Sequence, residues 1–247
     1  MDENKSIGLG LNDYPQKGLY LILKDGAKIT LTREHIEKTA EEYWNNPDKI
    51  PPQVKSAIEF QRCPFCPLKG KDDFCDAIRP IMPFLEIIDK YVSFDEVVAV
   101  YKDDDSSLLQ VADTTMQEAL KYISLLSLMQ YCQIGRVYWK YYMGIMPLKG
   151  GKEASTRLYL NIYNLCKGNK DEINKVISVF IQQIRITSQN QVKRMNLICK
   201  NDVFMNAFVN AQIVAEFLSM NIDKATAKAF EEFDKDIIKN PTTQLKA

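Results

Sequence analysis

The sequence predicts an α+β protein in which short β-hairpins pack with a predominantly helical bundle and a helical extension follows at the C-terminus. Two pairs of short apolar runs are joined by turn residues, as in β-hairpins. The later segments repeat apolar residues every three to four positions, as amphipathic helices do. Apolar residues make up 46% of the 247-residue chain, which is enough for one large domain with an extension.

Two β-hairpins are expected. The first pairs residues 19–23 with residues 28–31 through an Asp-Gly turn, which is a strong hairpin signal. The second pairs the β-branched run 96–101 with residues 108–112, across a turn with three consecutive aspartates. These aspartates lack the alternating order and closing glutamate of a calcium loop, so we interpret them as turn residues.

Helices are expected over most of the remaining chain. Thr32 is placed to cap a helix that ends near Tyr43, and Thr115 with Glu118 fits a capping box. The aromatic-rich stretch 136–144 is interpreted as a buried helix. The other expected helices span about 76–91, 115–131, 153–166, 170–187, 191–220 and 223–239, the first of them capped by Asp76.

The chain is expected to have three parts: a loose leader at 1–18, an α+β domain with a cysteine box at 19–188, and a helical extension at 189–247. Within the extension, the apolar face from Phe204 to Leu218 keeps a regular helical period. Such a face packs on neighbouring helices or on another chain. We therefore expect an unknown protein partner, or a homodimer formed through the C-terminal helices.

The charge and hydropathy of the chain indicate where in the cell it is located and which partners it lacks. The 32 basic and 32 acidic residues cancel, which disfavours nucleic-acid binding because such proteins carry a basic surplus. The N-terminus lacks the apolar core of a secretory signal, and no run approaches the roughly 18 apolar residues of a membrane span. We expect a cytoplasmic protein without membrane contact, whose six cysteines stay reduced.

The cysteines carry the most specific chemistry in the chain. Cys63, Cys66 and Cys75 follow a Cys-x2-Cys-x8-Cys spacing. A Cys-x-x-Cys pair supplies two thiolate ligands from one turn, and structural zinc is held by four ligands. Cys132, at the end of an expected helix, is the best candidate for the fourth ligand. The sequence therefore predicts a structural metal site, with zinc favoured over an iron–sulfur cluster because the spacing matches no ferredoxin pattern.

Two other interpretations of the box stay open. Cys-Pro-Phe-Cys is similar to the active-site tetrapeptide of glutaredoxin-like proteins, which favours a thiol-dependent redox protein or an iron–sulfur or redox sensor. That chemistry needs a strand before the pair, for which 57–60 is the candidate, and a helix directly after it, where 67–73 is loop-like. Pro67 counts against the zinc interpretation, because the residue after the second cysteine of a zinc knuckle commonly uses its N–H to stabilise the thiolate and a proline has none. The third interpretation is that the thiols are inert.

No catalytic motif is present, and the single histidine, His35, is expected on a helix surface. We therefore expect a non-enzymatic protein that acts through protein–protein contacts, in a regulatory role.

Several ordered motifs also carry a resemblance. They are an Asp-Gly turn at 25–26, Phe-Gln-Arg-Cys-Pro-Phe-Cys-Pro-Leu at 60–68, Val-Ser-Phe-Asp-Glu-Val at 92–97 and Thr-Met-Gln-Glu-Ala-Leu at 115–120. This series resembles an uncharacterised bacterial domain family without an assigned activity, over about residues 19–185. The resemblance matches Cys132 to a fourth family cysteine and so implies one shared site for the four cysteines.

The chain departs from the family pattern at a few positions. Asp76 stands where the family has a proline after the third cysteine, and Tyr131 and Gln133 replace the neighbours of the fourth. Ile145 stands in place of a histidine, which removes a potential ligand or acid–base group.

Overall fold

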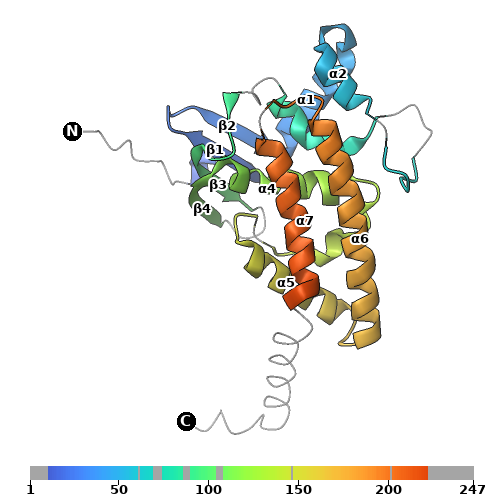
Figure 1. Cartoon of the computed structure of the whole chain (residues 1–247). Helices are drawn as coiled ribbons and strands as arrows, with labels where there is room; N and C mark the ends of the chain where they lie inside the picture. The colour runs from blue at the N-terminus through green and yellow to red at the C-terminus, as the bar shows by residue number, and fades with distance from the viewer. Residues whose placement is uncertain are drawn as a thin grey trace, which may run out of the picture.

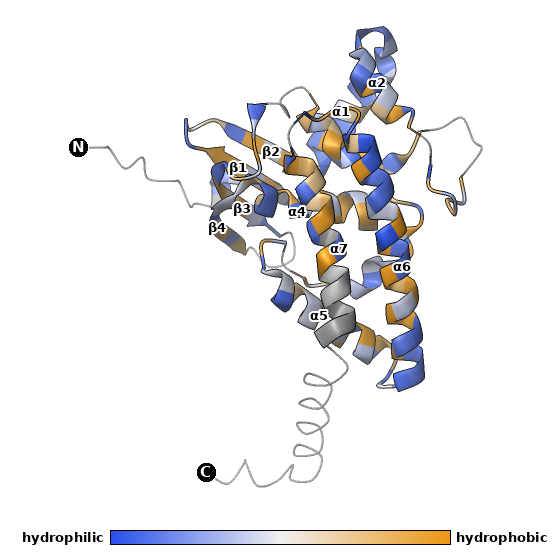
Figure 2. Ribbon diagram, viewed as in Figure 1, coloured by the Kyte–Doolittle hydropathy of each residue, from blue (hydrophilic) through white to orange (hydrophobic). Residues whose placement is uncertain are grey.

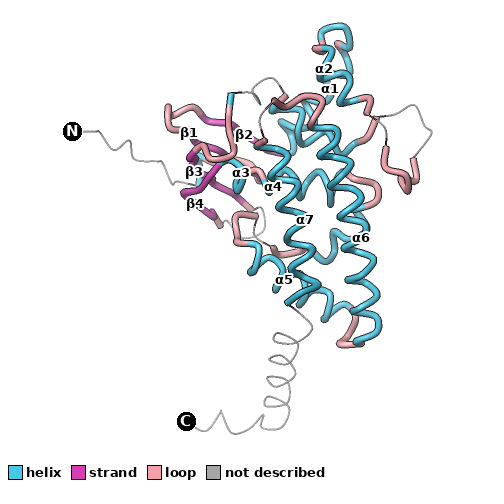
Figure 3. Tube along the Cα trace, viewed as in Figure 1, coloured by secondary structure: helices cyan, strands magenta, loops and turns pink. Residues whose placement is uncertain are grey.

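The computed structural model describes residues 11–60, 62–68, 74–85, 90–103, 108–145, 147–200 and 202–221. It confirms the expected α+β class: a four-stranded antiparallel sheet lies against a bundle of helices, and the C-terminal part is helical (Figures 1 and 3). The expected helix at 223–239 and most of the 1–18 leader lie outside the described residues. Within the described part of the chain, no helix is long and apolar enough to span a bilayer.

The N-terminal hairpin forms as expected from β1 (Gly18–Leu23) and β2 (Lys28–Thr32). Gly26 in its turn has a φ of 82°, a left-handed conformation that side chains rarely tolerate. The amide of Gly26 donates to the last carbonyl of β1, and Asp25 accepts a hydrogen bond from the amide of Ala27, each over 2.9 Å. The Asp-Gly pair thus closes the turn with both backbone and side chain.

The second hairpin, β3 (Glu96–Lys102) and β4 (Leu109–Thr115), also forms, and β3 pairs with β1. The strand order is therefore β2-β1-β3-β4. Alternate side chains point to opposite faces of the sheet. The inner face packs against the helices through Leu19, Leu21, Leu23, Leu31, Val97, Ala99 and Tyr101. The outer face has a smaller cluster of Tyr14, Tyr20 and Val100.

Helix α1 (Arg33–Asn45) begins where expected, because the Thr32 hydroxyl accepts a hydrogen bond from the amide of His35 over 3.2 Å. The next helix, α2 (Pro52–Ile58), covers the first half of the segment 57–60 where a redox site would need a strand, and residues 59 and 60 are not in a strand either. Pro52 favours this outcome, since a proline at the first helical position loses no hydrogen bond. The expectation of a strand before the cysteine box is wrong.

The segment after Cys75 is the 3₁₀ helix η3 (Asp76–Phe84), and Asp76 does not cap it. Pro80 and Pro83 lie inside this segment. Each lacks the N–H group that an α-helix would use, which explains the tighter and irregular winding.

The expected helix at 115–131 is divided into three pieces: α3 (Met116–Ala119), α4 (Lys121–Leu125) and the π-helical η5 (Leu126–Tyr131). Residues of all three pieces are buried in the main core. The π-helical turn ends directly before Cys132, and such turns are frequent at functional sites.

The capping box expected at the start of this region does not form. Thr115 occupies the cap position, but its hydroxyl is buried without a hydrogen-bond partner. The first amide of the helix, on Met116, donates instead to the carbonyl of Asp95 over 2.8 Å. Glu118 pairs with Lys121. Backbone contacts with the loop before β3 therefore replace the side-chain cap.

The aromatic segment forms the 3₁₀ helix η6 (Gly135–Tyr141), which is only half-buried. Tyr141 and Tyr142 lie in the core, whereas the side chains of Val137 and Trp139 are 60% and 38% exposed. The expectation of a wholly buried helix is therefore wrong for its outer face.

Three long helices complete the bundle: α5 (Gly151–Leu165), α6 (Lys170–Met195) and α7 (Val203–Asn221). Helix α6 begins at an Asn169 cap and runs unbroken through the point where one helix was expected to end and another to start. Three polar residues at this point, Ser188, Asn190 and Gln191, are buried inside the bundle. The expected domain boundary between 188 and 189 thus lies within α6.

Helix α7 lies alongside α6 and also packs on α5 and α4 (Figure 1). Apolar and hydrophilic residues alternate along α6, so that one of its faces meets the bundle (Figure 2). The described part of the C-terminal segment is therefore integral to the helical layer.

Candidate metal centre

The four cysteines proposed as ligands lie together in the structure. Cys63 and Cys132 are buried, and Cys66 and Cys75 pack against them while keeping part of their surface exposed. Three further apolar residues, Ala77, Ile134 and Ile186, complete this small cluster. It is separate from the main core of the protein. The chain thus brings Cys132 next to a box that precedes it by more than sixty residues.

The first pair of cysteines sits on a tight turn. The amide of Cys66 donates to the carbonyl of Cys63 over 3.0 Å, which closes the turn. Arg62 holds this turn against the next segment, because its Nη2 donates to the carbonyl of Phe74 over 2.8 Å. Its Nη1 lies 4.0 Å from the sulfur of Cys66. A single arginine therefore connects the box to the residue that precedes Cys75.

Cys75 is positioned by the start of η3. The carbonyl of Cys75 accepts a hydrogen bond from the amide of Ile78 over 3.0 Å. The buried hydroxyl of Ser127 donates to the carbonyl of Ala77 over 2.6 Å and so fastens η3 to η5. Because Cys132 directly follows η5, this bond holds the third and fourth cysteines in one frame.

Cys132 ends the π-helical turn, since its amide donates to the carbonyl of Ser127 over 3.0 Å. The backbone N–H groups of Ile134 and Gly135 lie near its sulfur and favour the thiolate form of Cys132. A side chain at position 135 could not be accommodated, because a Cβ there would lie 1.6 Å from the carbonyl oxygen of Leu128. Glycine therefore allows the close approach that brings two donors to this thiol.

The environment of Cys63 keeps its thiol protonated. Burial raises the pKa of Cys63 to about 12, and the neighbouring thiols of Cys132 and Cys75 add to the rise. The positive charge of Arg194 opposes it. A buried thiolate without a counter-charge is costly, so the proton leaves readily only when a cation takes its place.

The pKa of Cys132 is also raised. Burial raises its pKa to about 11, while the two backbone N–H groups of Gly135 and Ile134 lower it by stabilising the thiolate. The site therefore contains donors suited to a charged sulfur, although the uncharged thiol is the stable form in the absence of a cation.

A hydrogen-bonded network joins the neighbours of two cysteines. Gln133 donates to Asp76 over 3.1 Å, and Asp76 accepts from Arg79 over 3.1 Å. Arg79 also pairs with Glu37 of α1 over 2.8 Å, and Glu37 accepts from the hydroxyl of Tyr131 over 2.8 Å. The residues that flank Cys75 and Cys132 are thereby tied to each other and to α1.

The other sulfur and imidazole groups lie elsewhere. Cys166 and Cys199 are buried in the main core, and His35 is exposed on α1, as expected. In the described part of the chain, no three His, Cys, Asp or Glu side chains are already drawn into a coordination sphere. The four cysteines are therefore neighbours in one cluster whose sulfurs would have to close further around an ion.

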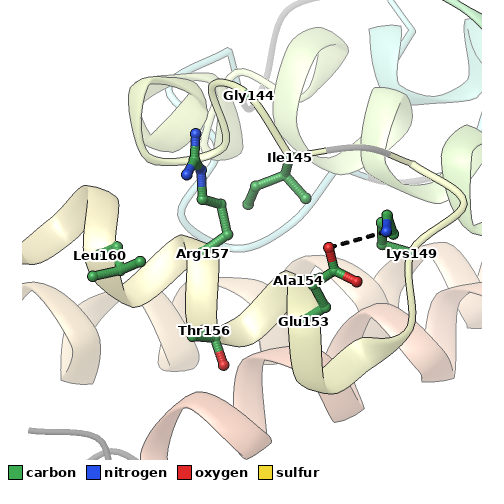
Figure 4. Close-up of a pocket in the computed structure, with 8 residues that line it drawn as sticks. All are labelled: Gly144, Ile145, Lys149, Glu153, Ala154, Thr156, Arg157 and Leu160. Carbon is green, nitrogen blue, oxygen red and sulfur yellow. Dashed lines mark ion pairs between the residues drawn. The ribbon is translucent and has the colours of Figure 1, made fainter. Parts of the chain in front are cut away.

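A concave feature lies at the start of α5, away from the cysteine cluster. It is an open groove of about 360 Å³ lined by Gly144, Ile145, Lys149, Glu153, Ala154, Thr156, Arg157 and Leu160. Lys149 and Glu153 pair across 3.2 Å, and Arg157 extends towards the turn at Gly144 (Figure 4). Arg157 is exposed to solvent, so the groove has the character of an ordinary charged surface.

The apolar face of α7 is partly occupied within the chain. Phe204, Ala207 and Phe208 are buried in the main core, and the ring of Phe204 meets that of Phe84 with 5.1 Å between centroids. These three side chains are therefore unavailable for the homodimer contact expected between 204 and 218.

Comparisons with known proteins identified no relative of this chain. Neither a protein-family model, nor a curated protein, nor a solved structure matches the chain.

Proposed function

We propose that Cys63, Cys66, Cys75 and Cys132 bind a structural zinc ion, and that this protein is a non-enzymatic, metal-clamped α+β protein of the cytoplasm that acts through protein–protein contacts. The clamp would join the cysteine turn, the start of η3 and the end of η5.

The observation that carries this proposal is the convergence of the four cysteines in one small cluster. Zinc prefers four thiolate or imidazole ligands in structural sites. The turn at Cys63–Cys66 offers two of them, and the other two come from segments fastened to each other by Ser127. The backbone N–H groups of Ile134 and Gly135 favour the thiolate form of Cys132 and would support a metal-bound sulfur there.

The same environment argues against the redox alternative. A redox cysteine needs a lowered pKa, which a helix N-terminus usually supplies. Burial instead raises the pKa of Cys63 to about 12. Helix α2 also occupies the place of the strand that such a site requires. These features favour a metal ligand over a nucleophile.

The clamp would serve protein contacts by fixing the shape of the surface around it. Phe65, between the first two cysteines, is 66% exposed although it is aromatic. Aromatic residues are enriched where proteins meet. Metal coordination by Cys63 and Cys66 would hold this ring on a rigid turn, ready for a partner.

The proposal is tested by measuring zinc in protein purified under reducing conditions. We expect one zinc per chain in the native protein, and loss of the metal in Cys63→Ser and Cys132→Ser. The matched controls are Cys166→Ser and Cys199→Ser, which alter equally buried thiols in the main core. Absence of zinc from the native protein after growth and refolding with excess Zn²⁺, or equal loss in the control variants, would refute the proposal.

A further inference from the structure

Arg194, on α6, is the most deeply buried charged residue in the described part of the chain. It is 0% exposed. Its Nη1 donates to Gln191 over 3.2 Å and its Nη2 to the carbonyl of Phe60 over 3.3 Å. Its Nε, however, is buried without a hydrogen-bond partner. An unpaired donor on a buried cation is costly, so an acceptor for it is expected nearby.

Arg194 differs in this respect from Arg79, which lies near the same cysteine cluster. Arg79 is paired with two carboxylates, Asp76 and Glu37. Among the residues that the structure describes, no carboxylate pairs with Arg194. A fully buried guanidinium surrounded by neutral partners leaves its charge uncompensated, and buried charges are almost always paired.

Among the described residues, the thiols of the cysteine cluster are candidates for a counter-charge. Arg194 lies close enough to Cys63 for the two groups to interact electrostatically, and it contacts Phe60, just before the cysteine box. Ile186 of the same helix packs on the cysteine cluster. Residues 186 and 194 are eight positions apart, so they lie on the same face of α6.

We propose that Arg194 is the counter-cation of the metal centre: its Nε–H donates to a thiolate sulfur of the cysteine cluster when a divalent ion is bound. The inference rests on the proposed zinc site. Four thiolates around one divalent ion leave a double negative charge, which a single buried guanidinium partly neutralises. Arg194 is thus a positioning residue that also compensates charge. It favours coordination of zinc by all four thiolates over coordination by fewer of them.

The test compares the zinc affinity of variants of the full chain, by competition with a chromogenic chelator. Arg194→Met keeps the length of the side chain and removes the charge, and we expect its zinc affinity to fall about 10- to 100-fold, as for other groups that support metal ligands. Arg194→Lys retains a charged donor and should lose less. Gln191→Met removes a hydrogen bond from the same guanidinium without removing its charge, and is the matched control.

A second readout separates charge compensation from simple packing. With Co²⁺ in place of zinc, the thiolate-to-cobalt absorption band reports hydrogen bonding to the sulfurs. It should shift in Arg194→Met and stay in place in Gln191→Met. If Arg194→Met fails to fold, the same comparison of Arg194→Lys with Gln191→Met decides the question.

The outcomes distinguish the two proposals. A native protein that binds no zinc overturns the metal centre itself. A native protein that binds zinc, together with an Arg194→Met variant of equal affinity and unshifted cobalt spectrum, overturns only the role of Arg194. Equal losses in Gln191→Met and Arg194→Met likewise count against it.

Discussion

Gln133 donates a hydrogen bond to Asp76, with 3.1 Å between its Nε2 and the carboxylate Oδ2. Each of the two residues directly follows a cysteine of the cluster, Cys132 in one case and Cys75 in the other. This bond therefore sets the distance between two segments that would have to hold one ion. Ligand positions in metal sites depend on such outer contacts nearly as much as on the ligands.

The bond belongs to a larger hydrogen-bonded network. Asp76, Gln133 and Tyr131 are joined in it through Arg79 and Glu37. The residue after Cys75 and the two residues on either side of Cys132 are therefore held together with α1.

Gln133→Ala is expected to weaken zinc binding about tenfold, because it frees the two cysteine segments from each other. The measurement is chelator competition on the folded protein. Gln110→Ala is the control, since Gln110 accepts a hydrogen bond from the amide of Leu148 at a distance of 3.2 Å, in a different part of the molecule. Equal zinc affinity in native protein and Gln133→Ala would show that the bond does not support the site.

Gly135→Ala is expected to destabilise the protein by at least about 3 kcal/mol, because its Cβ would lie 1.6 Å from the Leu128 carbonyl oxygen. Gly150→Ala is the control: a Cβ there meets nothing within 4 Å, so the change should cost less than about 1 kcal/mol. Urea unfolding of the two variants checks this. Similar midpoints would contradict the close approach of the 128 and 135 backbones.

Local signals predicted much of the fold. The Asp-Gly turn and the Thr32 cap depend on near neighbours in the chain, and both formed as expected. The capping box at Thr115 failed because carbonyls of the loop before β3 took the helix amides. The break expected before Gln191 failed because tertiary packing buries polar side chains that usually mark a loop. In both cases distant contacts overrode a local preference.

The site residues likewise include some that local sequence predicts and one that depends on distant contacts. Cys63, Cys66 and Cys75 are close in sequence, and spacing alone drew attention to them. Cys132 was assigned from its place at a helix end and from the resemblance. Arg194 gave no sequence signal, because an arginine in a helix is normally exposed and its burial follows from the packing of α6 against the box.

Ser93→Ala is expected to destabilise the protein by about 1–2 kcal/mol at neutral pH, allowing for the partial exposure of Asp202. The buried Ser93 hydroxyl donates to Asp202 over 2.6 Å and accepts from Asn206 over 2.9 Å, so it ties the start of α7 to the loop before β3. Thermal unfolding of native and variant protein measures the difference. An unchanged midpoint would mean that this contact contributes nothing to the docking of α7.

The same contact predicts a pH dependence. The hydrogen bond from Ser93 lowers the pKa of Asp202 in the folded protein. A lowered pKa stabilises the fold above the pKa of the unfolded chain, near 3.9, and this contribution disappears as pH falls through the folded value. The stability difference between native protein and Ser93→Ala should therefore shrink below about pH 4. A difference that stays constant to pH 2.5 would point to packing instead of the charged hydrogen bond.

Zinc affinity is expected to fall steeply as pH falls from 8 to 6. Burial raises the pKa values of Cys63 and Cys132 to about 12 and about 11, so both thiols hold protons that zinc must displace. For each proton that zinc must displace, the zinc affinity falls about tenfold per pH unit as the pH decreases. Cys166→Ser, which changes a thiol in the main core, should leave this slope unchanged. A pH-independent affinity in native protein would mean that these thiols do not bind the ion.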